Sequence, residues 1–153
     1  MLTIEKNSVA NAASQATVTR RPRNIALLAD GCFLLAVGLI FGISEFVSHF
    51  WGIGLQGVLF LGSPYTIGFF EAHGLAALVG FLLIRATRGS EQRFWHGFAA
   101  LVHLLLGGSN LTYWVSFVTF DFVVQGVIVT LAHGLFIVLQ LVCYVQTRSA
   151  ANP

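Results

Sequence analysis

Charged residues are scarce in this sequence: only 9% of its 153 residues are Asp, Glu, Lys or Arg. A soluble domain carries roughly 25%, and a large core cannot account for the deficit, because a chain of this length still exposes much of its surface. With 56% hydrophobic residues and a mean hydropathy of +0.81, the composition excludes an ordinary soluble domain. A lipid bilayer is therefore the expected environment of the chain.

Motifs for catalysis and for nucleic-acid binding are also missing. The sequence contains no P-loop, no dinucleotide-binding fingerprint and no arrangement typical of a nucleophilic Ser or Cys. Its basic residues are not interleaved with aromatic ones, which argues against nucleic acid as a partner. The two cysteines, Cys32 and Cys143, lack metal-type spacing and lie in apolar stretches, where we expect small buried side chains. No catalytic residue is assigned, and whether the protein is an enzyme stays open.

The sequence does contain four apolar segments, at about 24–48, 66–84, 94–117 and 120–145. Each meets the requirement of roughly 20 residues for a helix that crosses a hydrocarbon core of about 30 Å. They predict an all-α, polytopic membrane protein with a four-transmembrane-helix bundle over residues 24–147. Residues 1–23 predict a flexible tail and residues 148–153 a second tail. The Gly-punctuated segment between the first two spans predicts an interfacial or re-entrant piece.

The basic residues predict the orientation of these spans. All of them lie in the N-terminal tail, the loop between the second and third spans, or the C-terminal tail: Lys6, Arg20, Arg21, Arg23, Arg85, Arg88, Arg93 and Arg148. The other two connections contain none. By the positive-inside rule, both termini are expected in the cytoplasm (N-in/C-in). We expect a multi-pass protein of the bacterial inner membrane.

Ionisable side chains lie within the predicted spans, although each costs about 2.5–3.5 kcal/mol on insertion scales. The polar and small residues of each span share one side of a helical wheel. The clearest such side belongs to the third span: His96, Ala99, Ala100, His103, Gly107, Asn110 and Trp114. We expect the four polar sides to meet and to enclose a pocket that opens outward, with His103 and His133 at its floor.

Three histidines are the predicted ligands in this pocket: His73, His103 and His133. A metal would also use Glu71. Because imidazole binds haem iron and transition metals, haem b or a transition metal is the candidate cofactor. Further polar side chains are expected to surround the ligands or to handle protons: Glu45, Asn110, Gln125 and Asp121. Asp121 could also lie at the start of the fourth helix, near the positive end of its dipole.

The favoured function is a small membrane protein whose His/Glu-lined pocket binds a redox cofactor, a metal or a small apolar ligand. In one alternative the histidines only form hydrogen bonds between helices, and the chain is a non-catalytic subunit that docks onto a larger membrane complex or forms a homo-oligomer. In another, a Glu–His pair relays protons or serves a membrane enzyme as acid and base.

The second span opens with a glutamate and continues in Gly, Ala and Leu, as GFFEAHGLAALVGFLLIR at residues 68–85. Together with the chain length, the four spans and the short loops, this segment resembles the DoxX-like group of small bacterial membrane proteins. The resemblance implies a four-helix bundle and a loose connection to respiratory or redox-stress roles. It carries over no site residue, and the histidine content departs from that group.

Overall fold

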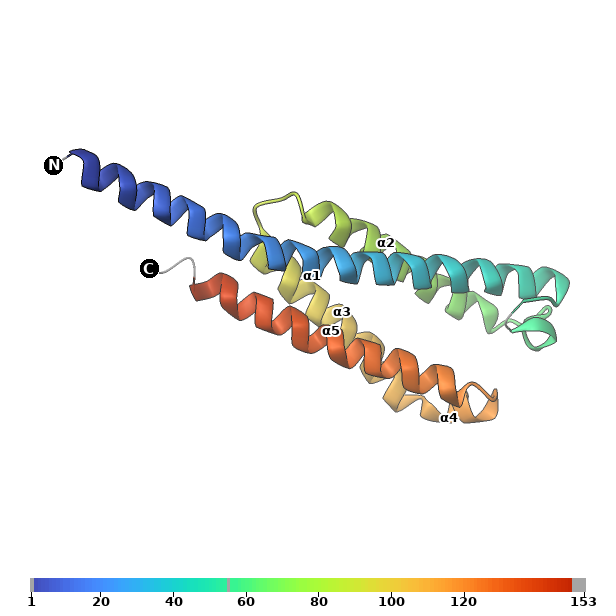
Figure 1. The fold of residues 1–153 in the computed structure, drawn as a ribbon. Coiled ribbons are helices and arrows are strands. Elements are labelled where there is room, and N and C mark those ends of the chain that lie inside the picture. The colour runs from blue at the N-terminus through green and yellow to red at the C-terminus, as the bar shows by residue number, and fades with distance from the viewer. Residues whose placement is uncertain (1, 55, 150–153) are drawn as a thin grey trace. The chain divides into compact units, whose positions relative to one another are not determined.

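The computed structural model describes residues 2–54 and 56–149, with side chains described for 23–54 and 56–147. In these residues all regular structure is helical, which confirms the predicted all-α class. The elements are α1 (Leu2–Trp51), the 3-10 turn η1 (Gly57–Phe60), α2 (Thr66–Ala86), α3 (Gln92–Thr112), α4 (Trp114–Thr119) and α5 (Val123–Ser149) (Figure 1). Three stretches are long and apolar enough to cross a membrane: Arg23–Trp51, Thr66–Ala86 and Val123–Thr147.

Two helix boundaries differ from the predicted spans. Helix α1 begins at Leu2, so the predicted N-terminal tail is helical, and its side chains up to residue 22 lie outside the described ones. The predicted third segment is divided, because α3 ends at Thr112 and α4 begins at Trp114. The division follows the run Gly107–Asn110, whose Gly, Ser and Asn residues are weak helix formers.

The turn after α4 is a Schellman motif. The backbone N–H of Phe122 donates to the carbonyl of Phe117 at 2.7 Å, and that of Asp121 donates to Val118 at 3.3 Å. Asp121 has a φ of 58°, the left-handed conformation that this motif requires at its turning residue. Asp121 therefore terminates α4, and α5 begins only at Val123.

The chain forms two compact units: the first contains residues 28–85, and the second contains residues 1–27 together with 86–153. In the first unit α1 and α2 form an antiparallel hairpin with very close backbones. A Cβ placed on Gly38 would lie 2.5 Å from the backbone nitrogen of Ala77 and from the carbonyl oxygen of His73, and one on Gly80 would lie 2.4 Å from the nitrogen of Leu35. Small residues of this kind allow membrane helices to approach closely.

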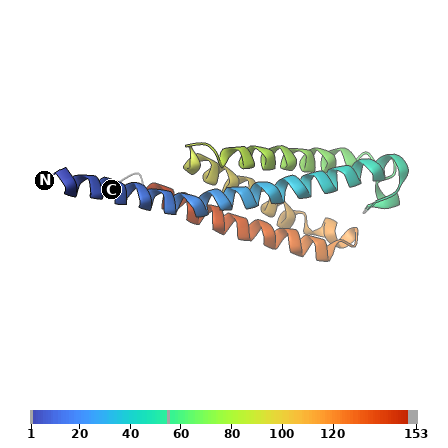
Figure 2. The same ribbon diagram turned by 45° about the horizontal axis from the view of Figure 1, so that its top comes forward.

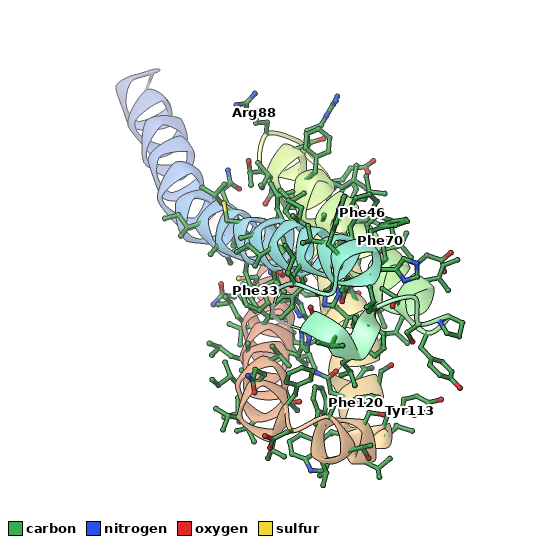
Figure 3. All side chains as sticks on the ribbon, turned by 90° about the vertical axis from the view of Figure 1, so that its right-hand side faces the viewer. Phe33, Phe46, Phe70, Arg88, Tyr113 and Phe120 are labelled. Carbon is green, nitrogen blue, oxygen red and sulfur yellow. The ribbon has the colours of Figure 1, made fainter. Side chains whose placement is uncertain are left out.

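The hairpin is closed by aromatic packing and by a folded connection. The rings of Phe46 on α1 and Phe70 on α2 approach to 6.3 Å between centroids (Figure 3). Ser48 donates to the carbonyl of Ile53 at 2.8 Å, so the connection turns back onto the end of α1. Gly52 has a φ of 65°, which permits that reversal.

In the second unit α3 and α5 lie side by side and antiparallel (Figures 1 and 2). Arg93 near the start of α3 bonds Tyr144 near the end of α5, and His103 meets His133 further along. The opposite sides of both helices carry exposed large apolar residues: Leu101, Leu104, Leu105, Val124, Leu131 and Leu135. The two histidines of α3, His96 and His103, thus face α5.

The two cysteines differ from the prediction that both are buried. Both are free thiols; Cys143 on α5 is buried, whereas Cys32 on α1 is exposed. The prediction for Cys32 is wrong because its position lies away from the small-residue face of α1, which contains Gly31 and Gly38 and contacts α2.

Candidate functional site

A buried glutamate and a histidine meet in the α1–α2 hairpin. Nδ1 of His73 on α2 lies 2.6 Å from Oε1 of Glu45 on α1, and the Glu45 side chain has no exposed surface. Gly31, Gly38 and Glu45 recur every seven residues, which places them on one side of α1. The glycines bring the helices together, and Glu45 extends from that same side toward His73.

The surroundings of this pair fix the histidine ring and leave the carboxyl group short of partners. The ring of Phe41, one turn before Glu45, stacks on His73 with centroids 5.2 Å apart and an interplanar angle of 19°. Both carboxyl oxygens of Glu45 and Nδ1 of His73 are buried without an aligned hydrogen bond among the described residues, although Nδ1 and Oε1 lie 2.6 Å apart. A buried carboxyl group without hydrogen bonds is costly, so Glu45 depends on the imidazole beside it for a polar contact.

Glu71 does not take part in this pair. It is exposed on α2, two residues before His73, and residues at that separation diverge on a helix. Of the acids predicted near His73, the structure therefore brings Glu45 to the imidazole and leaves Glu71 away from it. Gln125 and Asp121 are also exposed, and neither joins a histidine pair.

A second pair lies in the other unit, between α3 and α5. Nδ1 of His103 and Nδ1 of His133 are 2.8 Å apart, and both side chains are buried. One nitrogen must donate and the other accept, so the two rings hold different tautomers or protonation states at these atoms. Phe136 stacks on His103 at 4.9 Å, and Gly107 leaves room for His133, since a Cβ there would lie 3.1 Å from the Cβ of His133.

This geometry does not suit bis-histidine haem ligation. Two axial histidines lie on opposite faces of the macrocycle, whereas these rings are bonded directly, with centroids 5.1 Å apart. Among the described side chains, no three His, Cys, Asp or Glu residues lie together in a way that could hold a metal ion. The predicted set of His73, His103, His133 and Glu71 stays a prediction.

Two further contacts extend the α3–α5 seam. His96 donates from Nδ1 to Oε1 of Gln140 at 2.6 Å, and the Gln140 amide donates to the carbonyl of Ala26 on α1 at 3.5 Å. Gln140 is not among the predicted site residues, although its spacing of seven from His133 places it on the same side of α5. Asn110, a predicted member, lies nearer the other end of α3, and its buried Nδ2 has no partner among the described residues.

Comparisons of the chain with protein-family models, with curated proteins and with solved structures gave no match. The resemblance to the DoxX-like group therefore remains an expectation.

Proposed function

We propose that this chain is a small integral membrane protein with four membrane-crossing helices and an intramembrane acid–base site, Glu45–His73, whose ligand is a proton. The observation that carries the proposal is the 2.6 Å contact between a fully buried carboxyl group and an imidazole on the neighbouring helix. Ionisable groups within membrane helices are rare and recur in proton pathways, where they pair with one another. Of the ligands and residues expected from the sequence, our proposal thus keeps one ligand, the proton, and one pair of residues, Glu45 and His73.

The fourth crossing helix in this proposal is α3. It is 21 residues long, and its bonds to α5 run from Arg93 and Tyr144 at one end to His103 and His133 further along. A helix that accompanies a crossing helix over this length must lie at the same depth in the bilayer. Its polar residues reduce its hydropathy, but they face α5 and leave exposed leucines for lipid.

The proposed orientation is N-in/C-in, as the distribution of basic residues favours. In this orientation α1 crosses from the cytoplasm outward, and Glu45 belongs to the outer half of the bilayer. A proton from the outer aqueous phase would then reach the pair over a short distance. His73 is the accessible member, because its side chain is 26% exposed whereas that of Glu45 is fully buried.

The chemistry of the site follows from its two groups. A carboxyl–imidazole pair can hold one proton on either atom, and Phe41 keeps the ring in the plane that presents Nδ1 to Glu45. When Nδ1 carries the hydrogen, Nε2 is the nitrogen that accepts a further proton. The pair can thus take up a proton at Nε2 and balance the new charge with the carboxylate.

The test combines a structural and a transport measurement on the protein reconstituted in lipid. In ¹⁵N-histidine NMR, we expect Glu45→Gln to change the chemical shifts of the His73 ring nitrogens, and in proteoliposomes carrying a pH gradient we expect it to reduce proton flux at least tenfold. Glu71→Gln is the matched substitution on the same helix as His73, and we expect it to change neither measurement. If Glu71→Gln has the effect instead, the assignment of Glu45 is wrong.

Two other results would also decide against the proposal. If Glu45→Gln lowers stability but leaves both the His73 chemical shifts and the proton flux unchanged, the pair serves helix packing, as the subunit hypothesis expects. If the purified protein shows a Soret band that shifts on dithionite reduction and is lost in His103→Leu, the ligand is haem, and the direct His103–His133 contact is not the resting arrangement.

A further inference from the structure

Three helices of the second unit meet at one level near the ends that carry basic residues. Gln140 on α5 bonds both His96 on α3 and the carbonyl of Ala26 on α1. Arg23 lies one turn before Ala26 on α1, and Cys143 lies one turn beyond Gln140 on α5. Within this unit, the part of α1 that ends at Leu27 runs antiparallel to α5 and parallel to α3 (Figure 1).

The same register places the first residues of α3 at the level of Arg23 along the helices. Gln92 lies one turn before His96, as Arg23 lies one turn before Ala26, so the two side chains are at one level. Arg93 donates to the hydroxyl of Tyr144 at 3.1 Å and lies over its ring, which holds the end of α5 at that level too. We call Arg23, Asn24 and Gln92 the inner-end cluster.

The inner-end cluster contains buried polar atoms without hydrogen-bond partners among the described residues. They are one cationic donor, Nε of Arg23, and two acceptors, Oδ1 of Asn24 and Oε1 of Gln92. Arg23 is only 8% exposed. The Gln92 amide nitrogen is already satisfied by the carbonyls of Ala86 and Gly89, each at 3.2 Å, so its oxygen is the group that lacks a partner. Native proteins leave few such atoms unsatisfied, and each is costly when buried.

We propose that the inner-end cluster binds the headgroup of an anionic phospholipid that carries hydroxyl groups, as phosphatidylglycerol does. The phosphate accepts from the Arg23 guanidinium, and the headgroup hydroxyls donate to Asn24 and Gln92. A free phosphate ester would offer the same polar groups. The exposed Ile25 and Phe94 beside the cluster favour the lipid, because they offer apolar surface to acyl chains.

This inference rests on the membrane topology of the proposed function but not on its proton chemistry. Basic pockets between helices on the cytoplasmic side are typical sites for anionic headgroups. Arginine is suited to phosphate because its planar guanidinium donates from several N–H groups. The cluster also lies in a different unit from Glu45 and His73, so either proposal can fail without the other.

The experiment measures lipid binding to the purified full chain by native mass spectrometry and by the shift of its thermal unfolding temperature. Added lipids are phosphatidylglycerol, phosphatidylmethanol, phosphatidylethanolamine and phosphatidylcholine, with soluble glycerol phosphate in a separate arm. We expect one phosphatidylglycerol per chain, bound at least tenfold more tightly than phosphatidylcholine. Phosphatidylmethanol has the anionic phosphate without hydroxyls, and we expect it to bind several-fold more weakly than phosphatidylglycerol.

Two variants test the assigned atoms. Arg23→Lys keeps the charge but removes the guanidinium, and we expect it to weaken phosphatidylglycerol binding at least fivefold. Arg88→Lys is the control, since Arg88 is exposed in the loop before α3 (Figure 3); binding should be unchanged. Asn24→Leu removes one acceptor and should abolish the preference for phosphatidylglycerol over phosphatidylmethanol. Circular dichroism establishes that each variant is folded.

Several outcomes would overturn the assignment. Equal binding of phosphatidylglycerol and phosphatidylcholine, or equal losses in Arg23→Lys and Arg88→Lys, would mean general attraction to a basic surface. Phosphatidylethanolamine binding as tightly as phosphatidylglycerol would remove the requirement for a hydroxylated anionic headgroup. Soluble glycerol phosphate binding as tightly would make a free phosphate ester the ligand. A chain that carbonate washing releases from membranes would instead contradict the topology, and with it the proposed function.

Discussion

The close backbone contact at Gly38 provides a quantitative test of how the α1–α2 hairpin is held together. We expect Gly38→Ala to destabilise the hairpin, because the added Cβ would lie 2.5 Å from two backbone atoms, of Ala77 and His73, where ordinary contact begins at 3.4 Å. No side-chain rotation relieves a clash with backbone, so the helices must separate by roughly 1 Å. Glu45 lies two turns further on the same side, and the separation would lengthen its contact with His73.

Two opposing effects set the expected loss of unfolding free energy in Gly38→Ala. Adding a methyl group to a close-packed site costs about 1–3 kcal/mol, whereas replacing Gly by Ala in a helix returns up to about 1 kcal/mol. We expect a net destabilisation of about 1–2 kcal/mol, or roughly 5- to 30-fold in the folding equilibrium constant. Equilibrium unfolding in mixed micelles, followed by circular dichroism as the SDS fraction rises, measures this difference.

Gly42→Ala is the matched control on the same helix, one turn further along. The nearest atom to a Cβ there is the Cβ of His73 at 3.9 Å, an ordinary contact. This variant should be neutral or slightly more stable. Equal destabilisation by both substitutions would show that helix propensity or lipid exposure, rather than close approach, explains the loss. An unchanged Gly38→Ala protein would refute the role of the backbone contact.

Two further predictions concern the turn after α4 and the cysteines. Asp121 has a φ of 58°, so Asp121→Gly should stabilise the protein by up to about 1 kcal/mol, and Asp121→Val should destabilise it by more than that. Thermal unfolding in detergent measures both differences. The reverse order of stability would mean that the Asp121 carboxylate itself stabilises the turn. Because Cys32 is exposed and Cys143 is buried, a small apolar mercurial should modify Cys32 first and Cys143 only when the protein unfolds. Peptide mass spectrometry shows the order of modification. Simultaneous modification of both cysteines would contradict the packing of α5.

Much of the fold could be predicted from composition and periodicity, because both reflect whether each residue favours an apolar or a polar environment. The all-α class is confirmed, and α2 begins at Thr66, where the second span was predicted to begin. The division between α3 and α4 was missed, although Gly107 and Gly108 mark a weak stretch of helix. Hydropathy alone could not show it, since the segment stays apolar on both sides of the break.

The histidine pairs were harder to predict, because pairing depends on the register between helices. Helical wheels placed His103 and His133 on facing sides and at similar depth, and the structure joins them directly. The partner of His73 could not be chosen in this way, because a helical wheel turns Glu71 away from His73 but does not show which residue of another helix lies opposite. The seven-residue spacing from Gly31 through Gly38 to Glu45 was the missed signal, because it identifies the side of α1 that contacts α2.

Packing and proton uptake are connected differently in the two pairs. In hydrocarbon no water replaces a lost partner, so a polar contact between helices also holds them together. The His103–His133 contact needs one accepting Nδ1, and a proton placed on that atom leaves two donors facing one another. The Glu45–His73 contact persists when a proton is added at Nε2, because the new positive charge faces a carboxylate. A proton therefore opposes packing in the His103–His133 pair and is compatible with packing in the Glu45–His73 pair, and for this reason our proposal assigns the proton to Glu45–His73.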